Sequence, residues 1–264
     1  MLVVLKENAA EISRQAAILI AAAIRKKPAM TLGLATGGTM VGVYRELVRM
    51  HKLQGLDFSR VTTFNLDEYL GLPAGHPQSF RSFMQENLFA HLNIPERNIH
   101  IPDGSVTGDY DSYFARYEAS IRAAGGMDVQ LLGIGRNGHI GFNEPTSSLG
   151  SRTRLKVLSR DTMEDNRKFF GPEEKIPNCA ITVGIGTILE AKKILLLANG
   201  ASKAVPIAGA IEGPLTASVP ASALQMHPDV TFIIDGAAAS RLTHRDYYRQ
   251  VLEMTEILTP DRLH

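Results

Sequence analysis

Short apolar runs alternate with amphipathic segments along the whole sequence, and no other feature constrains the fold as strongly. Such runs are typical of strands buried on both faces of a sheet, and amphipathic segments are typical of surface helices. The predicted strands are residues 30–35, 61–66, 98–101, 128–134, 155–158, 193–197 and 230–234. The predicted helices are residues 40–54, 78–92, 110–124, 186–191, 202–212 and 245–257. This order predicts an α/β fold with a mostly parallel sheet and helices on both faces.

No Pro/Gly/Ser-rich linker, repeat or low-complexity block divides the chain, so we expect residues 1–264 to form a single domain. Cys179 is the one cysteine, which excludes an internal disulfide, and no Cys/His cluster has zinc-binding spacing. A chain without disulfides is expected in the cytoplasm. The apolar run at residues 16–24 follows several charged residues, which indicates an amphipathic first helix and not a signal peptide.

The overall charge gives no hint of a polyanionic partner. The formal net charge is +1, which provides no general attraction to nucleic acid or to an anionic membrane. No apolar stretch reaches the roughly 18 residues that indicate a membrane-spanning helix. We therefore expect neither nucleic acid nor a membrane as partner, and any bound anion must be held by local groups.

Polar loops follow three of the predicted strands, at the edge where ligands of such sheets bind. The first loop, Thr36, Gly37, Gly38 and Thr39, opens the helix predicted at 40–54. Glycines allow close backbone approach to a ligand, and helix-start N–H groups with threonine hydroxyls can hold a phosphate. A tight turn with Thr39 as helix N-cap explains the same residues. The spacing of a Walker loop is missing.

A carboxylate pair, Asp67 and Glu68, follows the predicted strand 61–66 and precedes Tyr69. A carboxylate at a strand end can serve as a general base. A solvated turn also explains the pair, so this segment alone leaves both interpretations open.

The third loop, residues 133–145, surrounds His139 with glycines and places Glu144 five residues further on. Histidine titrates near neutral pH and suits proton transfer, and a nearby carboxylate can orient it. A mobile glycine loop with an incidental histidine is the alternative. The loop also contains G-x-G-x-x-G, which is typical of dinucleotide sites in dehydrogenases. That fingerprint should open a helix, yet Gly141 and Pro145 follow within a few residues.

Cations on three other segments could hold an anion. Arg154 and Lys156 lie two residues apart on a predicted strand. Arg167 precedes two phenylalanines, and Lys203 begins a predicted helix. A cation beside helix-start amides suits a phosphate. Each of these side chains is also explained as a solvated surface charge.

Seven motifs together resemble the glucosamine-6-phosphate deaminases along nearly the whole chain. They are LATGGT (34–39), TFNLDEYLGL (63–72), HPQSF (76–80), GIGRNGHIGFNEP (133–145), SSLGSRTR (147–154), TVGIGTIL (182–189) and SKA (202–204). The related 6-phosphogluconolactonases share a Gly-His loop but lack the FNLDEY and FNEP combination. The resemblance implies a Rossmann-like α/β fold and a reaction of amino-sugar catabolism that needs neither metal nor cofactor.

The resemblance also implies roles for individual residues. Asp67 would be the base that moves the C2 proton of the substrate, and His139 would drive ring opening. Glu144 would orient His139 and raise its basicity. Asn137, where some members have aspartate, can accept the His139 N–H bond but adds no negative charge. The implied phosphate- and sugar-binding residues are Thr36, Gly37, Gly38, Thr39, Arg167 and Lys203.

Some deaminases of this group are hexamers activated by N-acetylglucosamine 6-phosphate between subunits, which makes a homo-oligomer one expectation here. The positions that correspond to their effector site are Ser147, Arg154, Lys156 and Tyr247. Val157 stands where the regulated form has threonine, so one hydroxyl is missing. An activated hexamer and an unregulated monomer or smaller oligomer both remain open.

Two other kinds of function compete with the deaminase. A sugar-phosphate lactonase or aldose–ketose isomerase could use the same scaffold without releasing ammonia. A sugar-phosphate-sensing module would need the phosphate loops but not Asp67, His139 and Glu144 together. Such a module usually carries a DNA-binding helix-turn-helix, which we do not expect before residue 30.

Overall fold

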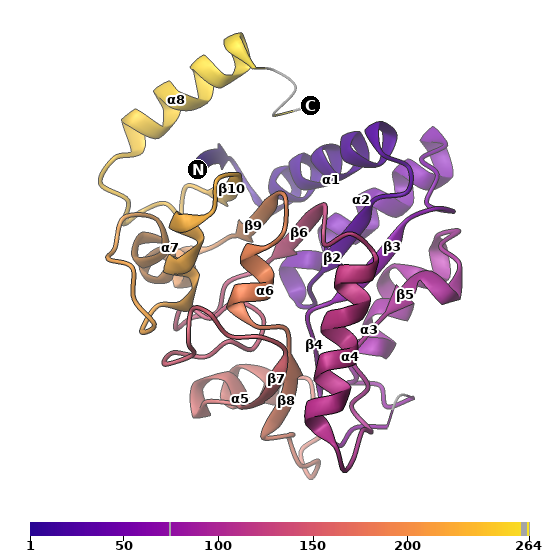
Figure 1. Cartoon of the computed structure of the whole chain (residues 1–264). Helices are drawn as coiled ribbons and strands as arrows, with labels where there is room; N and C mark the ends of the chain where they lie inside the picture. Colours follow the sequence, from indigo (N-terminus) through magenta and orange to yellow (C-terminus); the bar gives the residue numbers. More distant parts are fainter. Residues whose placement is uncertain (74, 260–262, 264) are drawn as a thin grey trace.

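A seven-stranded parallel sheet forms the centre of the computed structural model, which describes residues 1–73, 75–259 and 263 (Figure 1). The strand order is β1, β10, β9, β6, β2, β3, β5, and every neighbouring pair is parallel. The strands are β1 Leu2–Lys6, β2 Thr31–Leu34, β3 Thr62–Asn65, β5 Ile99–His100, β6 Val129–Leu132, β9 Ile194–Ala198 and β10 Val230–Asp235. The predicted parallel sheet is confirmed.

Helices cover both faces of this sheet, as predicted (Figure 1). Right-handed crossovers place α1 and α2 on one face, because both connect strands in the same direction across the sheet. The helices α4 and α7 connect strands in the opposite direction and lie on the other face. The helices are α1 Ala9–Lys26, α2 Gly38–Gln54, α3 Phe80–Asn87, α4 Tyr110–Ala123, α5 Arg160–Arg167, α6 Ile185–Leu189, α7 Ala204–Ile211 and α8 Arg245–Leu258.

A second, antiparallel sheet begins where β3 ends. Its strand order is β4 Asp67–Tyr69, β8 Cys179–Thr182, β7 Arg154–Val157. Leu66 joins the two sheets, because its N–H donates to the Leu34 carbonyl (3.0 Å) and its carbonyl accepts from the Val183 N–H (2.7 Å). The chain therefore leaves the main sheet at its carboxyl edge with Asp67 as the next residue.

Several elements differ from the sequence prediction. The strands β1, β4 and β8 and the helix α5 are not predicted, and β7 belongs to the small sheet. The helix predicted at 78–92 ends at Asn87 and is followed by one 3-10 turn, Phe89–His91. The small sheet escapes prediction because its short strands pair across large sequence separations, which leave no local pattern.

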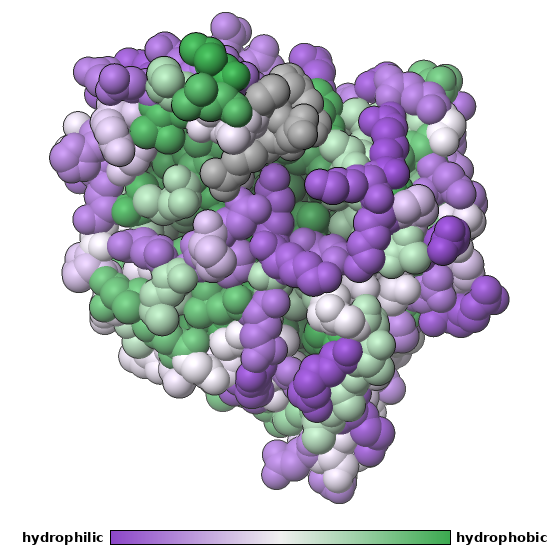
Figure 2. Space-filling view, turned by 45° about the horizontal axis from the view of Figure 1, so that its top comes forward, coloured by the Kyte–Doolittle hydropathy of each residue, from purple (hydrophilic) through white to green (hydrophobic). Residues whose placement is uncertain are grey.

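The helix α8 packs beside β1 but keeps a row of apolar side chains exposed. Tyr247, Met254, Ile257 and Leu258 are 63%, 46%, 70% and 69% exposed. In Figure 2 the molecule is turned so that the top of Figure 1, where α8 lies, comes forward. Apolar and polar side chains are mixed on this face. Among the residues that the structure describes, no helix is both long and apolar enough to cross a membrane.

Candidate active site

Asp67 lies at the junction of the two sheets and is 5% exposed. Tyr117 on α4 fixes the end of β3, since its hydroxyl donates to the Asn65 carbonyl (2.7 Å). Pairing with Thr182 on β8 fixes the next strand, β4. The solvated-turn interpretation is therefore wrong, because Asp67 and Glu68 are both buried.

The two neighbouring carboxylates have different surroundings. Glu68 accepts hydrogen bonds from the N–H groups of Tyr69 (2.9 Å), Phe80 (2.8 Å) and Arg81 (2.9 Å), and so fixes the start of α3. The Asp67 carboxylate accepts no hydrogen bond from any residue in the described part of the chain. Burial, with the charge of Glu68 as a second cause, raises the pKa of Asp67 to about 8. Asp67 is the carboxylate left available for proton transfer.

The glycine loop after β6 holds His139 in a tight turn. The Gly135 N–H donates to the His139 carbonyl (2.9 Å), and Gly138 has a φ of +85°. A Cβ at residue 135 would lie 2.2 Å from His139 Cε1, so only glycine leaves room for the imidazole. In the described chain, no helix starts between this loop and α5. The dinucleotide interpretation is wrong for that reason, because its fingerprint must open a helix.

Asn137 connects His139 to Glu144. His139 Nδ1 lies 2.8 Å from Asn137 Oδ1 and 3.7 Å from Glu144 Oε2, while Asn137 Nδ2 donates to Glu144 Oε2 (2.8 Å). The carboxylate can only accept, so the amide nitrogen of Asn137 must face it and the amide oxygen must face histidine. His139 then carries its proton on Nδ1 and has a free lone pair on Nε2.

The electrostatics of this group favour a neutral histidine beside a charged carboxylate. Burial lowers the pKa of His139, Glu144 opposes this shift, and the Lys203 ammonium adds to it. Burial alone would raise the pKa of Glu144. Hydrogen bonds from the Thr162 hydroxyl, Asn137 and the Ser159 N–H, together with His139, instead hold it below its usual value.

The first predicted phosphate loop lies beside the loop that follows β9. Thr39 Oγ1 donates to Asn199 Oδ1 (3.3 Å). Gly37 has a φ of +114° and is the N-cap of α2, which has no side-chain cap, so the prediction of Thr39 as N-cap is wrong. A Cβ at Gly37 or Gly38 would meet no atom within 4 Å, so both glycines border open space. Thr36 is half-buried next to them.

Lys203 follows β9 on the same loop as Asn199, the contact of Thr39. It ends the 3-10 turn Ala201–Lys203, and its Nζ donates to the Ile134 carbonyl (2.7 Å) at the start of the histidine loop. Burial lowers the pKa of Lys203. Asp235 holds the turn in place, because its carboxylate accepts from the Gly200 N–H (3.1 and 3.0 Å). Lys203 is thus fixed against the histidine loop, and its role in phosphate binding stays a prediction.

Arg167 lies apart from these loops. The side chain, at the end of α5, is exposed and donates to the carbonyls of Gly171 (3.0 Å), Glu174 (2.8 Å) and Pro172. These bonds close the loop that follows α5. Phosphate binding by Arg167 stays a prediction that requires this loop to release the guanidinium.

The residues of the predicted effector set are not all brought together in one chain. Arg154 and Lys156 project from the same side of β7, and Arg154 with burial lowers the pKa of Lys156. Ser147 is buried, with no hydrogen-bond partner for its hydroxyl among the described residues. Tyr247 lies on α8, at the opposite end of the molecule from β7 (Figure 1).

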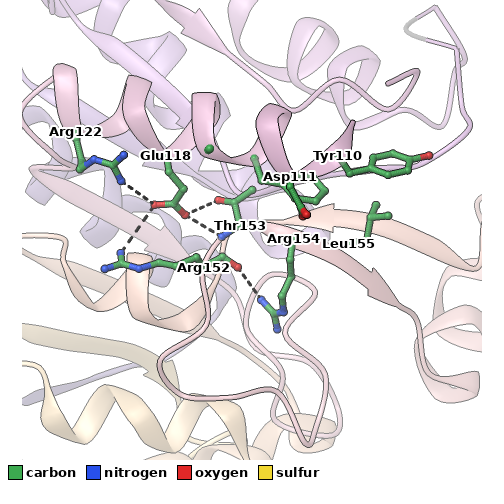
Figure 3. A pocket seen from close by; sticks show the side chains of 10 residues that line it. Tyr110, Asp111, Glu118, Arg122, Arg152, Thr153, Arg154 and Leu155 are labelled. Carbon is green, nitrogen blue, oxygen red and sulfur yellow. Dashed lines mark hydrogen bonds and ion pairs between the residues drawn. The ribbon is translucent and has the colours of Figure 1, made fainter. Parts of the chain in front are cut away.

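A separate cavity of about 680 Å³ opens between α4 and β7 (Figure 3). Its wall includes Glu118, whose carboxylate accepts from Thr153 N (2.8 Å), Thr153 Oγ1 (2.7 Å) and Thr187 Oγ1 (2.7 Å). Sequence analysis gives no signal for Glu118, which resembles an ordinary surface acid of an amphipathic helix. The cavity is lined by Tyr110, Asp111, Phe114, Ala115, Glu118, Arg122, Arg152, Thr153, Arg154 and Leu155.

Fold and site together define an α/β enzyme with acid–base groups at the carboxyl edge of a parallel sheet. Within the described residues, no group of three or more His, Cys, Asp or Glu side chains could hold a metal ion. The chain belongs to the family of glucosamine-6-phosphate isomerases and 6-phosphogluconolactonases, whose sequence model matches residues 5–233.

Known proteins similar to this chain fall into two groups. The glucosamine-6-phosphate deaminases of Shewanella woodyi and Cellvibrio japonicus are 51% and 53% identical over 251 residues, which is 95% of each chain. The structure of a monomeric glucosamine-6-phosphate deaminase is 44% identical, with a TM-score of 0.88 over 91% of this chain and 100% of that chain. A 6-phosphogluconolactonase from Trypanosoma cruzi is 23% identical, with a TM-score of 0.73 over 92% and 97%, and shares the fold alone.

Proposed function

We propose that this enzyme converts glucosamine 6-phosphate and water to fructose 6-phosphate and ammonia, in the catabolism of amino sugars. The observation that carries the proposal is a pair of acid–base centres beside one anion cradle. Asp67 is a buried carboxylate whose pKa is raised to about 8, and His139 is a neutral imidazole supported by Glu144. The similarity to deaminases over nearly the full chain supports the choice of substrate.

Ring opening is assigned to His139. Its Nδ1 proton is bound to Asn137, so the free lone pair of Nε2 can accept the proton of the C1 hydroxyl. The C1–O5 bond then breaks, and the same proton returns to O5. Glu144 stabilises the imidazolium that exists between these two steps.

Isomerisation is assigned to Asp67. The open aldehyde acidifies the C2 proton, and the Asp67 carboxylate removes it. The substrate ammonium gives one proton to O1, which leaves a neutral enolamine. The substrate ammonium beside Asp67 favours the ionised carboxylate that this step needs. Return of the proton to C1 gives an imine at C2, and water hydrolyses the imine to fructose 6-phosphate and ammonia.

Phosphate binding is assigned to the cradle formed by the loops after β2 and β9. The phosphate would be held by the helix-start N–H groups at Gly37 and Gly38, by the Thr36 and Thr39 hydroxyls and by the Lys203 ammonium. Arg167 would join them after release from its loop. The cradle fixes one end of the sugar, so that C1 and C2 lie between Asp67 and His139.

The setting of the enzyme is part of the proposal. We place the reaction in the cytoplasm, without nucleic acid or membrane partners. A homo-oligomer is the assembly to test, because α8 leaves Met254, Ile257 and Leu258 exposed. Light scattering of the purified protein measures the assembly directly.

The decisive experiment is an ammonia assay with glucosamine 6-phosphate and no added cofactor. We expect equal amounts of ammonia and fructose 6-phosphate. Hydrolysis of 6-phosphogluconolactone without ammonia release would overturn the proposal and favour a lactonase. The Asp67→Asn variant, purified in the same way, controls for contaminating deaminase.

A further inference from the structure

A four-residue turn, residues 140–143, lies between the two acid–base centres. His139 precedes the turn and Glu144 follows it. The tip is Gly141, with a φ of +56°. A Cβ at Gly141 would lie 3.3 Å from Asp67 Oδ2 and 3.1 Å from Thr182 Oγ1, so the tip rests directly against the base. The position of this turn therefore sets both the solvation of Asp67 and its separation from His139.

The side chain of Asn143 holds the turn in position through hydrogen bonds inside the protein. Its side chain is fully buried, and Nδ2 donates to the carbonyls of Ile140 (2.9 Å) and Val183 (2.9 Å). The first bond adds to the backbone bond that closes the turn, from the Asn143 N–H to the same carbonyl (3.0 Å), and the second ties the turn to the end of β8. Arg154 Nη1 donates to Asn143 Oδ1 (2.9 Å) from β7. All the hydrogen-bonding groups of the Asn143 amide are therefore used.

The chemistry of these partners requires an amide. Aspartate would point a carboxylate oxygen at two carbonyl oxygens. Alanine would remove the side-chain bonds to the Val183 carbonyl and from Arg154, while the backbone bond from the N–H of residue 143 to the Ile140 carbonyl (3.0 Å) would remain. Thr182 also holds the turn, because its Oγ1 accepts a hydrogen bond from the Phe142 N–H (3.0 Å).

We propose that Asn143, supported by Arg154, is a positioning residue that fixes the Asp67 base relative to the His139–Glu144 pair. The role rests on the proposed function, because it concerns two groups that must act on adjacent atoms of one substrate. A displacement of about 1 Å between such groups can reduce turnover by about 100-fold.

The test compares Asn143→Ala with Asn98→Ala. Asn98 is the matched control, because its Nδ2 also donates to a carbonyl, that of Val61 (3.2 Å), at the opposite end of β3. We expect kcat per folded enzyme to fall by about 100-fold in Asn143→Ala with little change in KM, because the phosphate cradle is intact. Asn98→Ala should keep wild-type kcat.

The titration of Asp67 supplies a readout that does not depend on the reaction. The ionisable groups facing Asp67 are Glu68 and three buried tyrosines, Tyr44, Tyr69 and Tyr117, whose pKa values are raised by burial. Displacing the turn admits water to the carboxylate. Carboxyl NMR should then show a lower pKa for Asp67 in Asn143→Ala and no change in Asn98→Ala.

If Asn143→Ala does not fold, Arg154→Met tests the same chain of contacts, with a smaller loss of kcat in the same direction. Unchanged kcat and an unchanged Asp67 titration in a folded variant would overturn the positioning role. Failure of the proposed function is a different result, because the wild-type enzyme would then release no ammonia from glucosamine 6-phosphate.

Discussion

Asp67 and Glu144 are two buried carboxylates at the same edge of the molecule, 5% and 3% exposed, yet their pKa values move in opposite directions. Burial raises the pKa of Asp67 to about 8, because no donor in the described chain compensates for lost water. Glu144 is surrounded by donors from Asn137, Ser159 and Thr162, which outweigh burial. Local donors and the neighbouring His139, acting against burial, therefore distinguish a carboxylate that stays charged from one that exchanges protons.

The largest expected effect comes from removing the carboxylate with the raised pKa. Asp67→Asn keeps the shape of the side chain but cannot accept the C2 proton, so kcat should fall by about 100- to 10,000-fold. Steady-state kinetics with a coupled ammonia assay measure the loss. A variant that keeps more than about a tenth of wild-type kcat would exclude Asp67 as the base.

Stability provides the control for this variant. In the folded protein Asp67 holds its proton up to about pH 8, whereas a free carboxyl ionises near pH 4. The unfolded chain therefore binds fewer protons between these values, and the wild-type free energy of unfolding decreases as pH rises through this window. Asp67→Asn removes that dependence, so it should be more stable than wild type at pH 8, with a smaller advantage at pH 5.

Glu144→Gln should change the pH dependence of stability in the opposite direction from Asp67→Asn, and it should lower kcat less. The amide carries no charge to stabilise the imidazolium, and its NH2 group would face one of the donors that the carboxylate now accepts from. We therefore expect kcat to fall by about 100-fold, the lower end for acid–base groups. A depressed pKa contributes stability above the unfolded value, and this contribution is lost as pH falls through the folded value. The variant should therefore be less stable than wild type at pH 7 and approach it at acid pH, as measured by urea denaturation. Equal stability at both pH values would contradict the contrast with Asp67.

The sequence predicts the surroundings of Glu144 better than those of Asp67. Asn137, His139 and Glu144 lie within eight residues, so a single glycine-rich loop reveals the group. The parallel strands are also predictable, because each is a buried apolar run. The turn at 140–143 is held by hydrogen bonds to Thr182 and Val183, which lie 40 residues from their partners in the sequence. A third bond comes from Arg154, 11 residues from Asn143. Contacts over such separations leave no local pattern, and Asp67 is buried only because β8 pairs with β4.

Within the described residues, the proposed phosphate-binding residues make no hydrogen bond or ion pair with Asp67 or Glu144. Their loss should therefore weaken substrate binding and leave the pKa values of these two carboxylates unchanged. Lys203→Ala removes a charged hydrogen-bond donor and should raise KM by about 1.5–3 kcal/mol, or roughly 10- to 150-fold. Arg167→Ala should raise KM less, because the Arg167 guanidinium is engaged with carbonyls of its own loop. Initial rates over a range of glucosamine 6-phosphate concentrations separate KM from kcat. Unchanged KM in both variants would remove these two residues from the site.

The smallest expected effect concerns regulation from β7. Arg154 contacts Asn143, so a ligand that moved Arg154 would act on the turn beside both centres. Within one chain, Tyr247 lies at the opposite end of the molecule from Arg154 and Lys156 (Figure 1). A monomer should therefore show hyperbolic kinetics that N-acetylglucosamine 6-phosphate does not change.

An oligomer that brings Tyr247 of the partner subunit to β7 should behave differently. The acetylated sugar should then lower the half-saturating substrate concentration, with a coupling of about 1–3 kcal/mol. Initial rates with and without the acetylated sugar, on material of known assembly, decide between these outcomes. Lys156→Ala is the sharper variant, because Lys156 makes no hydrogen bond to residues 133–145 in the described part of the chain, and its loss should remove activation alone. Activation of a proven monomer would contradict the need for Tyr247 and place the effector within one chain.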